Sequence, residues 1–551
     1  MRILYRVLAA VLIGWLAAPA QAQIVERPIP GDPVQTDAGK VSGMILPSGV
    51  KAYLGLPFAA PPVRELRWRA PQAVKPWQGV FHADRKAPEC IQVLRAHNIN
   101  HYFGEEATSE DCLYLNIWAP ATAKPGSRLP VIVYLYGGGN TIGSSGMALY
   151  GGEQVAASGA VFVNFNYRVG ALGFMAHPQL TAESPQHSSG NYAHLDQIAA
   201  LQWVHRNIAR FGGDPSQVVI SGQSAGAYSV SLLQATPLAR GLFRGVLGMS
   251  GSTFGLERAA PPSLAEAEQV GLQVAAALKA ADIEALRQMP ADRILSVQQD
   301  CQLGCSGSIR IGGANIDGYL LPAAPAELFA SGRHSDVPVI IGFTRDESSN
   351  DLRSARTVAQ YNDAATRLYG AKAGELLRLY PAATDTDVAV QGASAAREGG
   401  TMTQAGRNWA IAQSRWSKAP AYLYQFSRVH PFNPAVVIAD HPEAIGAYHT
   451  SDVPFWFQTQ EALNLFRPTR LWSDADRQFA RDMTASLMQF ARTGNPSTTA
   501  LPWQPWRADN ERMLDLGRAV TASQLNTERL EFHRLNPANA STQTAPRGAR
   551  D

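Results

Sequence analysis

One serine of this chain stands between two glycines in the stretch FGGDPSQVVISGQSAGAYSV (Phe211–Val230). The apolar run Val218–Ser221 predicts a buried strand, and the residues after Ser224 predict a helix. In a turn this tight, the backbone two residues before the serine meets the backbone two residues after it. Gly222 and Gly226 remove that clash and tolerate strained dihedrals. The stretch therefore predicts a nucleophile elbow, whose serine oxygen is exposed at a helix N-terminus that favours an anion.

The rest of the chain alternates short apolar runs with helical patterns. Further buried strands are predicted at Val131–Tyr136, Ala160–Arg168, Gly245–Ser250, Pro338–Phe343 and Ala421–Phe426. Helices are predicted at Asn191–Phe211, which a Gly-Gly-Asp-Pro sequence ends, and at Asp474–Gly494, which is amphipathic. Strands that alternate with helices favour an α/β fold with a large, mainly parallel sheet and helices on both faces.

Two regions, about Gly251–Ser335 and Asp351–Asn408, break this alternation. They form either helical insertions over the carboxyl edge of the sheet, where α/β folds bind ligands, or ordinary scaffold helices. Both alternatives stay open on the sequence. Residues 23–536 are predicted to form one domain, and residues 537–551 lack apolar anchors and are predicted to be a loose tail.

The first 22 residues have the pattern of a secretory signal peptide. Arg2 and Arg6 precede a short apolar stretch, Val7–Ala18, and the small residues Ala20 and Ala22 favour cleavage after Ala22. The alternative, a membrane anchor, is disfavoured because a span needs ~20 apolar residues. We therefore expect an exported protein, periplasmic or secreted, with no membrane span.

The charge of the chain argues against a polyanionic partner. The formal net charge is +3, and the loss of both leader arginines leaves +1, because residues 1–22 carry no acid. The chain contains no run of lysines and arginines, so nucleic acid is not expected as a partner.

Four cysteines are present, and an even number in an exported chain indicates disulfides. They are Cys90, Cys112, Cys301 and Cys305. Three pairings are possible, of which we favour the sequence neighbours, Cys90–Cys112 and Cys301–Cys305. The alternative is a metal site at the second pair, but no nearby His or Cys completes the ligand set, so we expect no metal.

A serine hydroxyl needs partners to act as a nucleophile at neutral pH. It needs a histidine base and a carboxylate that orients the histidine, and in this kind of fold they follow in the order serine, acid, histidine. The oxyanion that forms needs backbone N–H donors. The sequence YGGGN, which follows the predicted strand Val131–Tyr136, is a good source because glycines let the backbone approach the substrate.

These motifs resemble those of the type-B carboxylesterase/cholinesterase family of α/β-hydrolases. FGGDPSQVVISGQSAG resembles its serine signature, EDCLYLNIW (Glu110–Trp118) its second signature and YGGGN its oxyanion loop. GFTRDES (Gly342–Ser348) resembles its acid loop and GAYHTSDVPFWF (Gly446–Phe457) its histidine loop. The motifs stand in the family's order over nearly the whole chain. The resemblance implies an α/β-hydrolase fold and a carboxylic-ester hydrolase that needs no cofactor.

The resemblance also implies roles for individual residues. Ser224 is the nucleophile, Glu347 the acid and His449 the base. Asp346 is the alternative acid, and His430 and His441 are the alternative histidines. The remaining implied residues are Gly138, Gly139 and Ala225 in the oxyanion hole, Asp452 and Ser250 in support of the histidine, and the disulfide Cys90–Cys112.

The chain departs from the family pattern at positions that bear on substrate choice. Asn140 stands where an aromatic residue usually follows the glycines, Gln223 replaces a common glutamate, and Thr344 and Ser348 replace Asn and Gly in the acid loop. Asn140, with Arg310, could accommodate an ester that carries a carboxylate. Exported bacterial relatives include esterases that remove tricarballylate side chains from fumonisin mycotoxins, and the chain resembles them in general layout.

Three other functions remain as alternatives. They are a general short-chain esterase, an interfacial lipase and a non-catalytic binding module, since some family relatives are adhesion proteins. The expected partner is a small-molecule ester, and the sequence says nothing of the oligomeric state.

Overall fold

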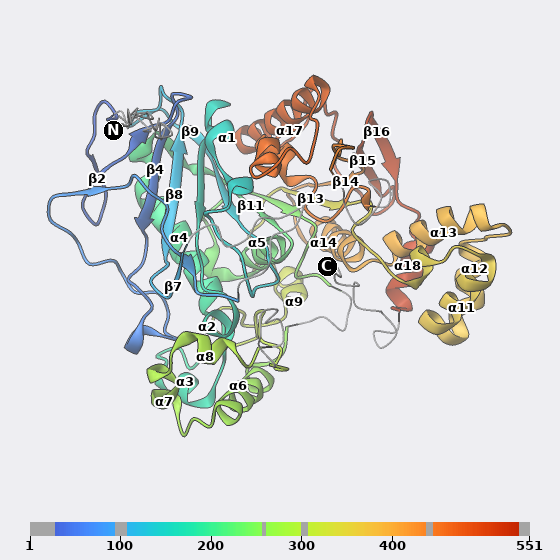
Figure 1. Cartoon of the computed structure of the whole chain (residues 1–551), viewed down its shortest axis with the longest axis horizontal. Coiled ribbons are helices and arrows are strands. Elements are labelled where there is room, and N and C mark those ends of the chain that lie inside the picture. The colour runs from blue at the N-terminus through green and yellow to red at the C-terminus, as the bar shows by residue number, and fades with distance from the viewer. Residues whose placement is uncertain (1–27, 94–106, 256–260, 299–306, 437–444, 539–551) are drawn as a thin grey trace, which may run out of the picture.

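A single large sheet runs through the centre of the molecule (Figure 1). The computed structural model describes residues 28–93, 107–255, 261–298, 307–436 and 445–538. The spatial order of the strands is β16 (Val520–Gln524), β15 (Arg512–Leu516), β14 (Ala421–Phe426), β13 (Val339–Thr344), β12 (Gly245–Met249), β11 (Gly213–Gln223), β9 (Leu129–Leu135), β10 (Val161–Phe165), β8 (Tyr114–Ala119), β4 (Lys51–Pro57) and β3 (Met44–Ile45).

The strands from β15 to β10 are all parallel, and antiparallel strands close both edges. All six predicted strands lie in this parallel part, which confirms the predicted α/β fold. Their residues are almost entirely buried because helices cover both faces.

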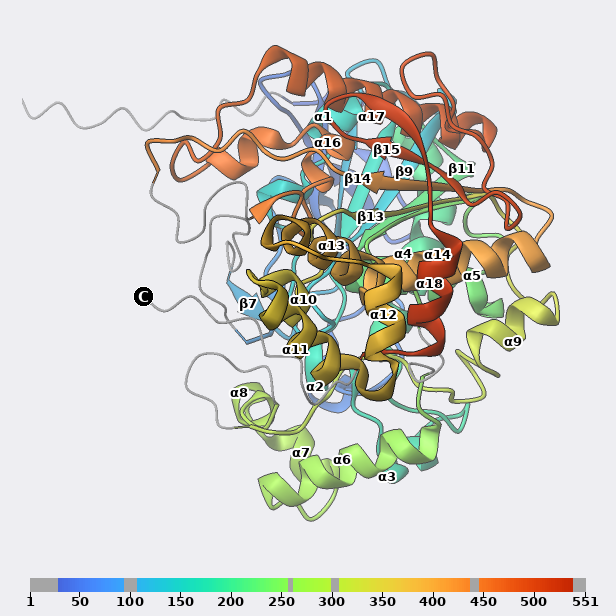
Figure 2. The same cartoon turned by 90° about the vertical axis from the view of Figure 1, so that its right-hand side faces the viewer.

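Helices flank the sheet in two layers (Figure 2). One layer contains α1 (Glu153–Ala157), α16 (Val453–Phe457) and α17 (Asp474–Thr493), and the other contains α4 (Tyr192–Asn207), α5 (Ala225–Ala235) and α14 (Thr401–Trp416). Helix α17 begins at a capping box made by Ser473 and Asp476 and ends at Gly494, whose φ is 77°. These end signals explain why the prediction Asp474–Gly494 is nearly correct.

Each of the two irregular regions contains both kinds of helix, inserted helices and scaffold helices. Helices α6 (Leu264–Leu278), α7 (Ile283–Gln288) and α8 (Ala291–Leu295) gather beside α2 (Gly170–Phe174) and α3 (Pro178–Glu183), which follow the carboxyl end of β10. Four helices, α10 (Asp351–Ser354), α11 (Val358–Tyr369), α12 (Ala373–Leu379) and α13 (Asp385–Glu398), share a second apolar core with α18 (Thr527–Leu535). By contrast, α9 (Pro325–Ala330) and α14 pack against each other, and α14 covers the sheet.

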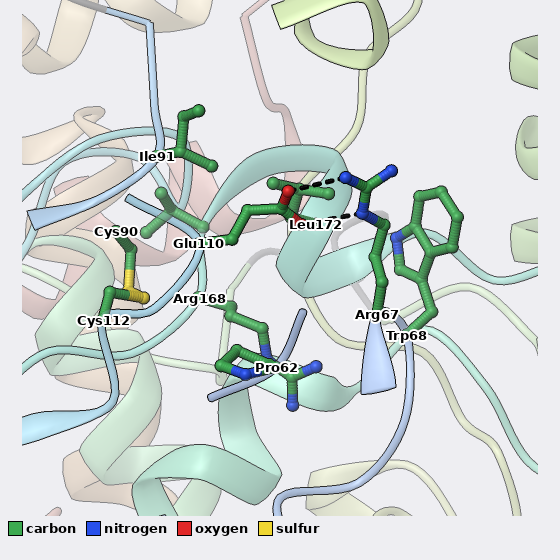
Figure 3. Close-up of a pocket in the computed structure, with 10 residues that line it drawn as sticks. Pro62, Arg67, Trp68, Cys90, Ile91, Glu110, Cys112, Arg168 and Leu172 are labelled. Atoms are coloured by element: carbon green, nitrogen blue, oxygen red, sulfur yellow. Dashed lines mark hydrogen bonds and ion pairs between the residues drawn. A yellow bond between two sulfur atoms is a disulfide. The ribbon is translucent and has the colours of Figure 1, made fainter. Parts of the chain in front are cut away.

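A disulfide joins Cys90 and Cys112, as the sequence predicted (Figure 3). Beside it lies a cavity of about 10 Å³, which has room for about one water and none for an ester. Its lining includes the ion pair of Arg67 and Glu110. The second predicted pair, Cys301 and Cys305, lies outside the described residues.

The predicted leader and most of the predicted tail also lie outside the described residues, which begin at residue 28 and end at residue 538. Within the described part of the chain, no helix combines the length and the apolar character that a membrane span requires.

Candidate active site

Ser224 lies at the sharp turn between β11 and α5, with φ 57° and ψ −122°. A Cβ at Gly222 would lie 2.2 Å from the Gly226 carbonyl oxygen, and one at Gly226 would lie 2.1 Å from the Leu135 carbonyl oxygen. No side chain fits at either position, so both residues must be glycine because a backbone carbonyl oxygen lies too close. The Ser224 N–H donates to the Met249 carbonyl at 2.8 Å, which ties the strained turn to β12.

Glu347 and His449 lie 102 residues apart in the chain and are in direct contact. The Nδ1 atom of His449 is 2.5 Å from Glu347 Oε2, and Glu347 Oε1 accepts the backbone N–H of Thr344 at 2.9 Å. The Glu347 side chain is 1% exposed and that of His449 is 33% exposed. A buried carboxylate thus holds one ring nitrogen and leaves the other, Nε2, to face the elbow.

The environment of His449 raises the pKa of its imidazole. Burial lowers that pKa, but the hydrogen bond and charge of Glu347, together with the charge of Asp452, outweigh burial and raise it above the ordinary 6.5. The pair therefore favours the imidazolium that a general base becomes once it has taken a proton.

Gln223, the residue before the serine, also contacts the histidine. Its Nε2 lies 3.0 Å from His449 Nε2, where an amide N–H donates to the ring nitrogen lone pair. Both residues belong to the described part of the chain, and there Ser224 Oγ forms no hydrogen bond with His449. This contact occupies the ring nitrogen of His449 that faces the elbow. The sequence marked Gln223 as unusual but did not predict this contact.

The alternative acid and histidines have other partners. The Asp346 carboxylate accepts from Ala447 N–H at 2.8 Å rather than from His449. His430 is buried against the Ser451 carbonyl, and burial lowers the pKa of its ring to about 3. His441 lies outside the described residues.

Three backbone N–H groups belong to the glycine loop after β9 and to the first residue of α5. Those of Gly138, Gly139 and Ala225 have no hydrogen-bond acceptor within the described part of the protein. Gly138 has a φ of 115°, and a Cβ there would lie 2.2 Å from the Ile142 carbonyl oxygen. The preceding Gly137 packs against Gln223 and Ser224, so the glycine loop adjoins the serine.

Asp452 is fully buried near the Glu347–His449 pair. Tyr424 on β14 donates its hydroxyl to Asp452 Oδ2 at 2.6 Å. Sequence analysis missed this partner because the position of Tyr424 in an apolar run indicates only a strand residue. Burial above all raises the pKa of Asp452 to about 6, and the nearby Glu347 charge adds to that rise. The hydroxyl of Ser250 is also buried, and neither it nor Asp452 Oδ1 has a hydrogen-bond partner in the described residues.

Replacing Asp452 with asparagine is expected to stabilise the fold at pH 8 relative to pH 4. A carboxyl whose folded pKa of about 6 exceeds the ordinary 3.8 costs stability as pH rises through that window, by about 3 kcal/mol when fully ionised. Asparagine carries no charge and removes this cost. Urea unfolding of the variant and the wild type at pH 4 and pH 8 measures the difference, with the exposed Asp363→Asn as the control. A difference independent of pH contradicts the prediction.

Asn140 and Arg310 come from separate segments that meet beside the glycine loop. Asn140 has a φ of 62°, and its Oδ1 is buried without a partner among the described residues. A Cβ at Gly312 would lie 3.5 Å from the Asn140 Cβ, so the segment that carries Arg310 passes next to it. Arg310 itself is exposed.

Comparison with known proteins shows the family of the chain. Residues 31–533 match the sequence model of the carboxylesterase family. The chain is 36% identical to a fumonisin B1 esterase of Sphingopyxis macrogoltabida, over 88% of this chain and 86% of that protein. It is 31% identical to the para-nitrobenzyl esterase of Bacillus subtilis (strain 168), over 89% of this chain and 95% of that protein. A solved structure of a PNB esterase matches with a TM-score of 0.73 at 29% identity, covering 91% of this chain and 98% of the other.

Proposed function

Because the chain belongs to the carboxylesterase family and is a carboxylic ester hydrolase, we propose that it acts through Ser224, His449 and Glu347 and an acyl-enzyme. The observation that supports this most is the 2.5 Å contact between Glu347 and His449 next to the elbow. The relatives reported above are esterases, which favours catalysis over the alternative of a binding module.

The reaction proceeds in two steps. In the first, Ser224 Oγ attacks the ester carbonyl while its proton passes to His449 Nε2, and the oxyanion is held by the N–H groups of Gly138, Gly139 and Ala225. The C–O bond to the alcohol then breaks, and the alcohol leaves with the proton from His449. In the second step, His449 takes a proton from water, the hydroxide attacks the acyl carbonyl, and Ser224 leaves reprotonated with the free acid as product. Glu347 stays ionised and stabilises the imidazolium in both steps.

We further propose that the acyl group carries a carboxylate, as the tricarballylate side chains of fumonisins do. Arg310 is a positive charge on the segment that passes beside Asn140 at Gly312, and Asn140 itself carries an amide that could bind a carboxylate. The likeness to a fumonisin B1 esterase supports the same choice. A general short-chain esterase, or a lipase, is the alternative within the same chemistry.

A pair of esters of one alcohol tests this choice, one with a neutral short acyl group and one with a carboxylate-bearing acyl group. We expect Arg310→Gln to lower kcat/KM about tenfold for the anionic ester, because a charge-assisted hydrogen bond is lost, and to leave the neutral ester unchanged. Arg481→Gln, at an exposed site on α17, is the matched control. Equal effects on both esters, or a wild-type preference for the neutral ester, would show a general esterase.

We also propose that residues 1–22 direct export to the periplasm or the medium and are then removed. The disulfide Cys90–Cys112 supports an oxidising compartment. The N-terminal residue of the mature protein, read from a culture of the source cell, tests the cleavage site.

A further inference from the structure

The Asp346 carboxylate joins the segment that carries Glu347 to the segment that carries His449. Its Oδ2 accepts the Ala447 N–H at 2.8 Å, and the Asp346 N–H donates to the Ala447 carbonyl at 3.0 Å. Gly446 has a φ of 62°, and a Cβ there would lie 2.3 Å from Asp346 Oδ2. The two segments are therefore joined one residue before the acid and two residues before the histidine.

Arg353 on α10 anchors the same acid segment from its other side. Its Nη1 donates to the carbonyls of Asp346 at 3.2 Å and Ser348 at 3.3 Å, the two residues that flank Glu347. Its Nη2 lies 3.3 Å from Asp346 Oδ1, and its side chain is 19% exposed. One guanidinium thus binds the backbone on both sides of Glu347. It also binds the Asp346 carboxylate, which contacts the histidine segment.

Arg345 provides a natural comparison because it pairs with the same carboxylate without these further contacts. Its guanidinium lies 2.8 Å from Asp346 Oδ2, and its side chain is 36% exposed. In the part of the chain that the structure describes, this side chain donates to no carbonyl of the acid segment. Exposed ion pairs of this kind contribute little to the stability of a protein.

We propose that Asp346 and Arg353 are positioning residues, which hold Glu347 and His449 at bonding distance and act on the ester only through those two side chains. The inference rests on the triad proposed above. It also gives Asp346, which the sequence left as a rival for the acid, a separate role.

The test compares Arg353→Gln and Asp346→Ala with Arg345→Gln on p-nitrophenyl acetate. Misplacement of a catalytic group by about 1 Å can cost about 100-fold, so we expect kcat to fall about 10- to 100-fold in the first two variants, with KM changed less than about threefold. Arg345→Gln is expected to stay within about twofold of the wild type. Arg353→Lys, which keeps the charge but loses the planar fork, should restore part of the rate.

The pH profile separates positioning from a loss of fold. A looser contact with Glu347 stabilises the imidazolium less, so the acid limb of kcat/KM should move to lower pH in Arg353→Gln and Asp346→Ala. Near-ultraviolet circular dichroism and thermal unfolding measure the folded fraction. The proposal is overturned if kcat stays near wild type, or if its loss equals the loss of folded protein with an unchanged pH profile. Failure of the triad itself would look different, because Glu347→Gln and His449→Ala would then keep activity.

Discussion

Replacing Ser224 with alanine is expected to lower kcat for ester hydrolysis by about 10⁶-fold. Alanine removes the hydroxyl of the residue at the N-terminus of α5, so no acyl-enzyme forms. The backbone is expected to stay intact because the turn is imposed by Gly222 and Gly226 and not by the serine hydroxyl. Steady-state rates at micromolar enzyme, with wild-type contamination excluded by separate expression, measure the loss.

Two controls accompany this variant. The exposed Ser158→Ala should keep full activity, and an organophosphonate probe should add its mass to the wild type but not to Ser224→Ala. The small rate that remains in Ser224→Ala reflects substrate binding and oxyanion donors that do not depend on the serine oxygen. Near wild-type hydrolysis by Ser224→Ala, or equal labelling of both proteins, would place the nucleophile elsewhere.

The parts of the fold that sequence analysis predicted are those with strong local signals. The run Ala421–Phe426 matches β14 from end to end, because a mainly apolar stretch of that length suits a strand buried on both faces. The edge strands β3 and β16 were missed, since they are short and carry little apolar periodicity. The end of α4 was also approximate, because its last turn continues as a 3₁₀ helix, Ile208–Phe211, with the same apolar spacing.

In the candidate site, too, the sequence predicted the residues that belong to local motifs and missed the contacts between distant side chains. Motif resemblance predicted the roles of Ser224, Glu347 and His449, and the structure places Ser224 at the sharp turn before α5 and Glu347 in contact with His449. The contacts of Gln223, Tyr424 and Arg353 depend on side chains that meet only in three dimensions, and no spacing in the sequence encodes them. These partners depend on the topology of the sheet, which places β11, β12, β13 and β14 next to one another in that order.

Replacing Glu347 with glutamine is expected to lower kcat by about 10⁴-fold without unfolding the protein. Glutamine keeps the shape of the side chain, but its amide can donate a hydrogen bond to His449 Nδ1. The ring then carries its proton on Nε2, where it cannot accept a proton from Ser224. Glu347→Asp, which keeps the charge and shortens the reach, should retain more activity than glutamine. Steady-state kinetics on one soluble ester across the three proteins measures the order.

The pH dependence gives the same prediction a second, independent readout. In the wild type the pKa of His449 is raised above 6.5, and the base works only when neutral. Activity should therefore fall as pH drops through a value above 6.5. In Glu347→Gln the hydrogen bond and charge that raise the pKa are gone while burial still lowers it, so the acid limb of the remaining activity should move to lower pH. If Asp346→Asn instead caused the larger rate loss and the larger shift, Asp346 would be the acid. The contact of Glu347 with His449 at 2.5 Å, against that of Asp346 with Ala447, leads us to expect the opposite order.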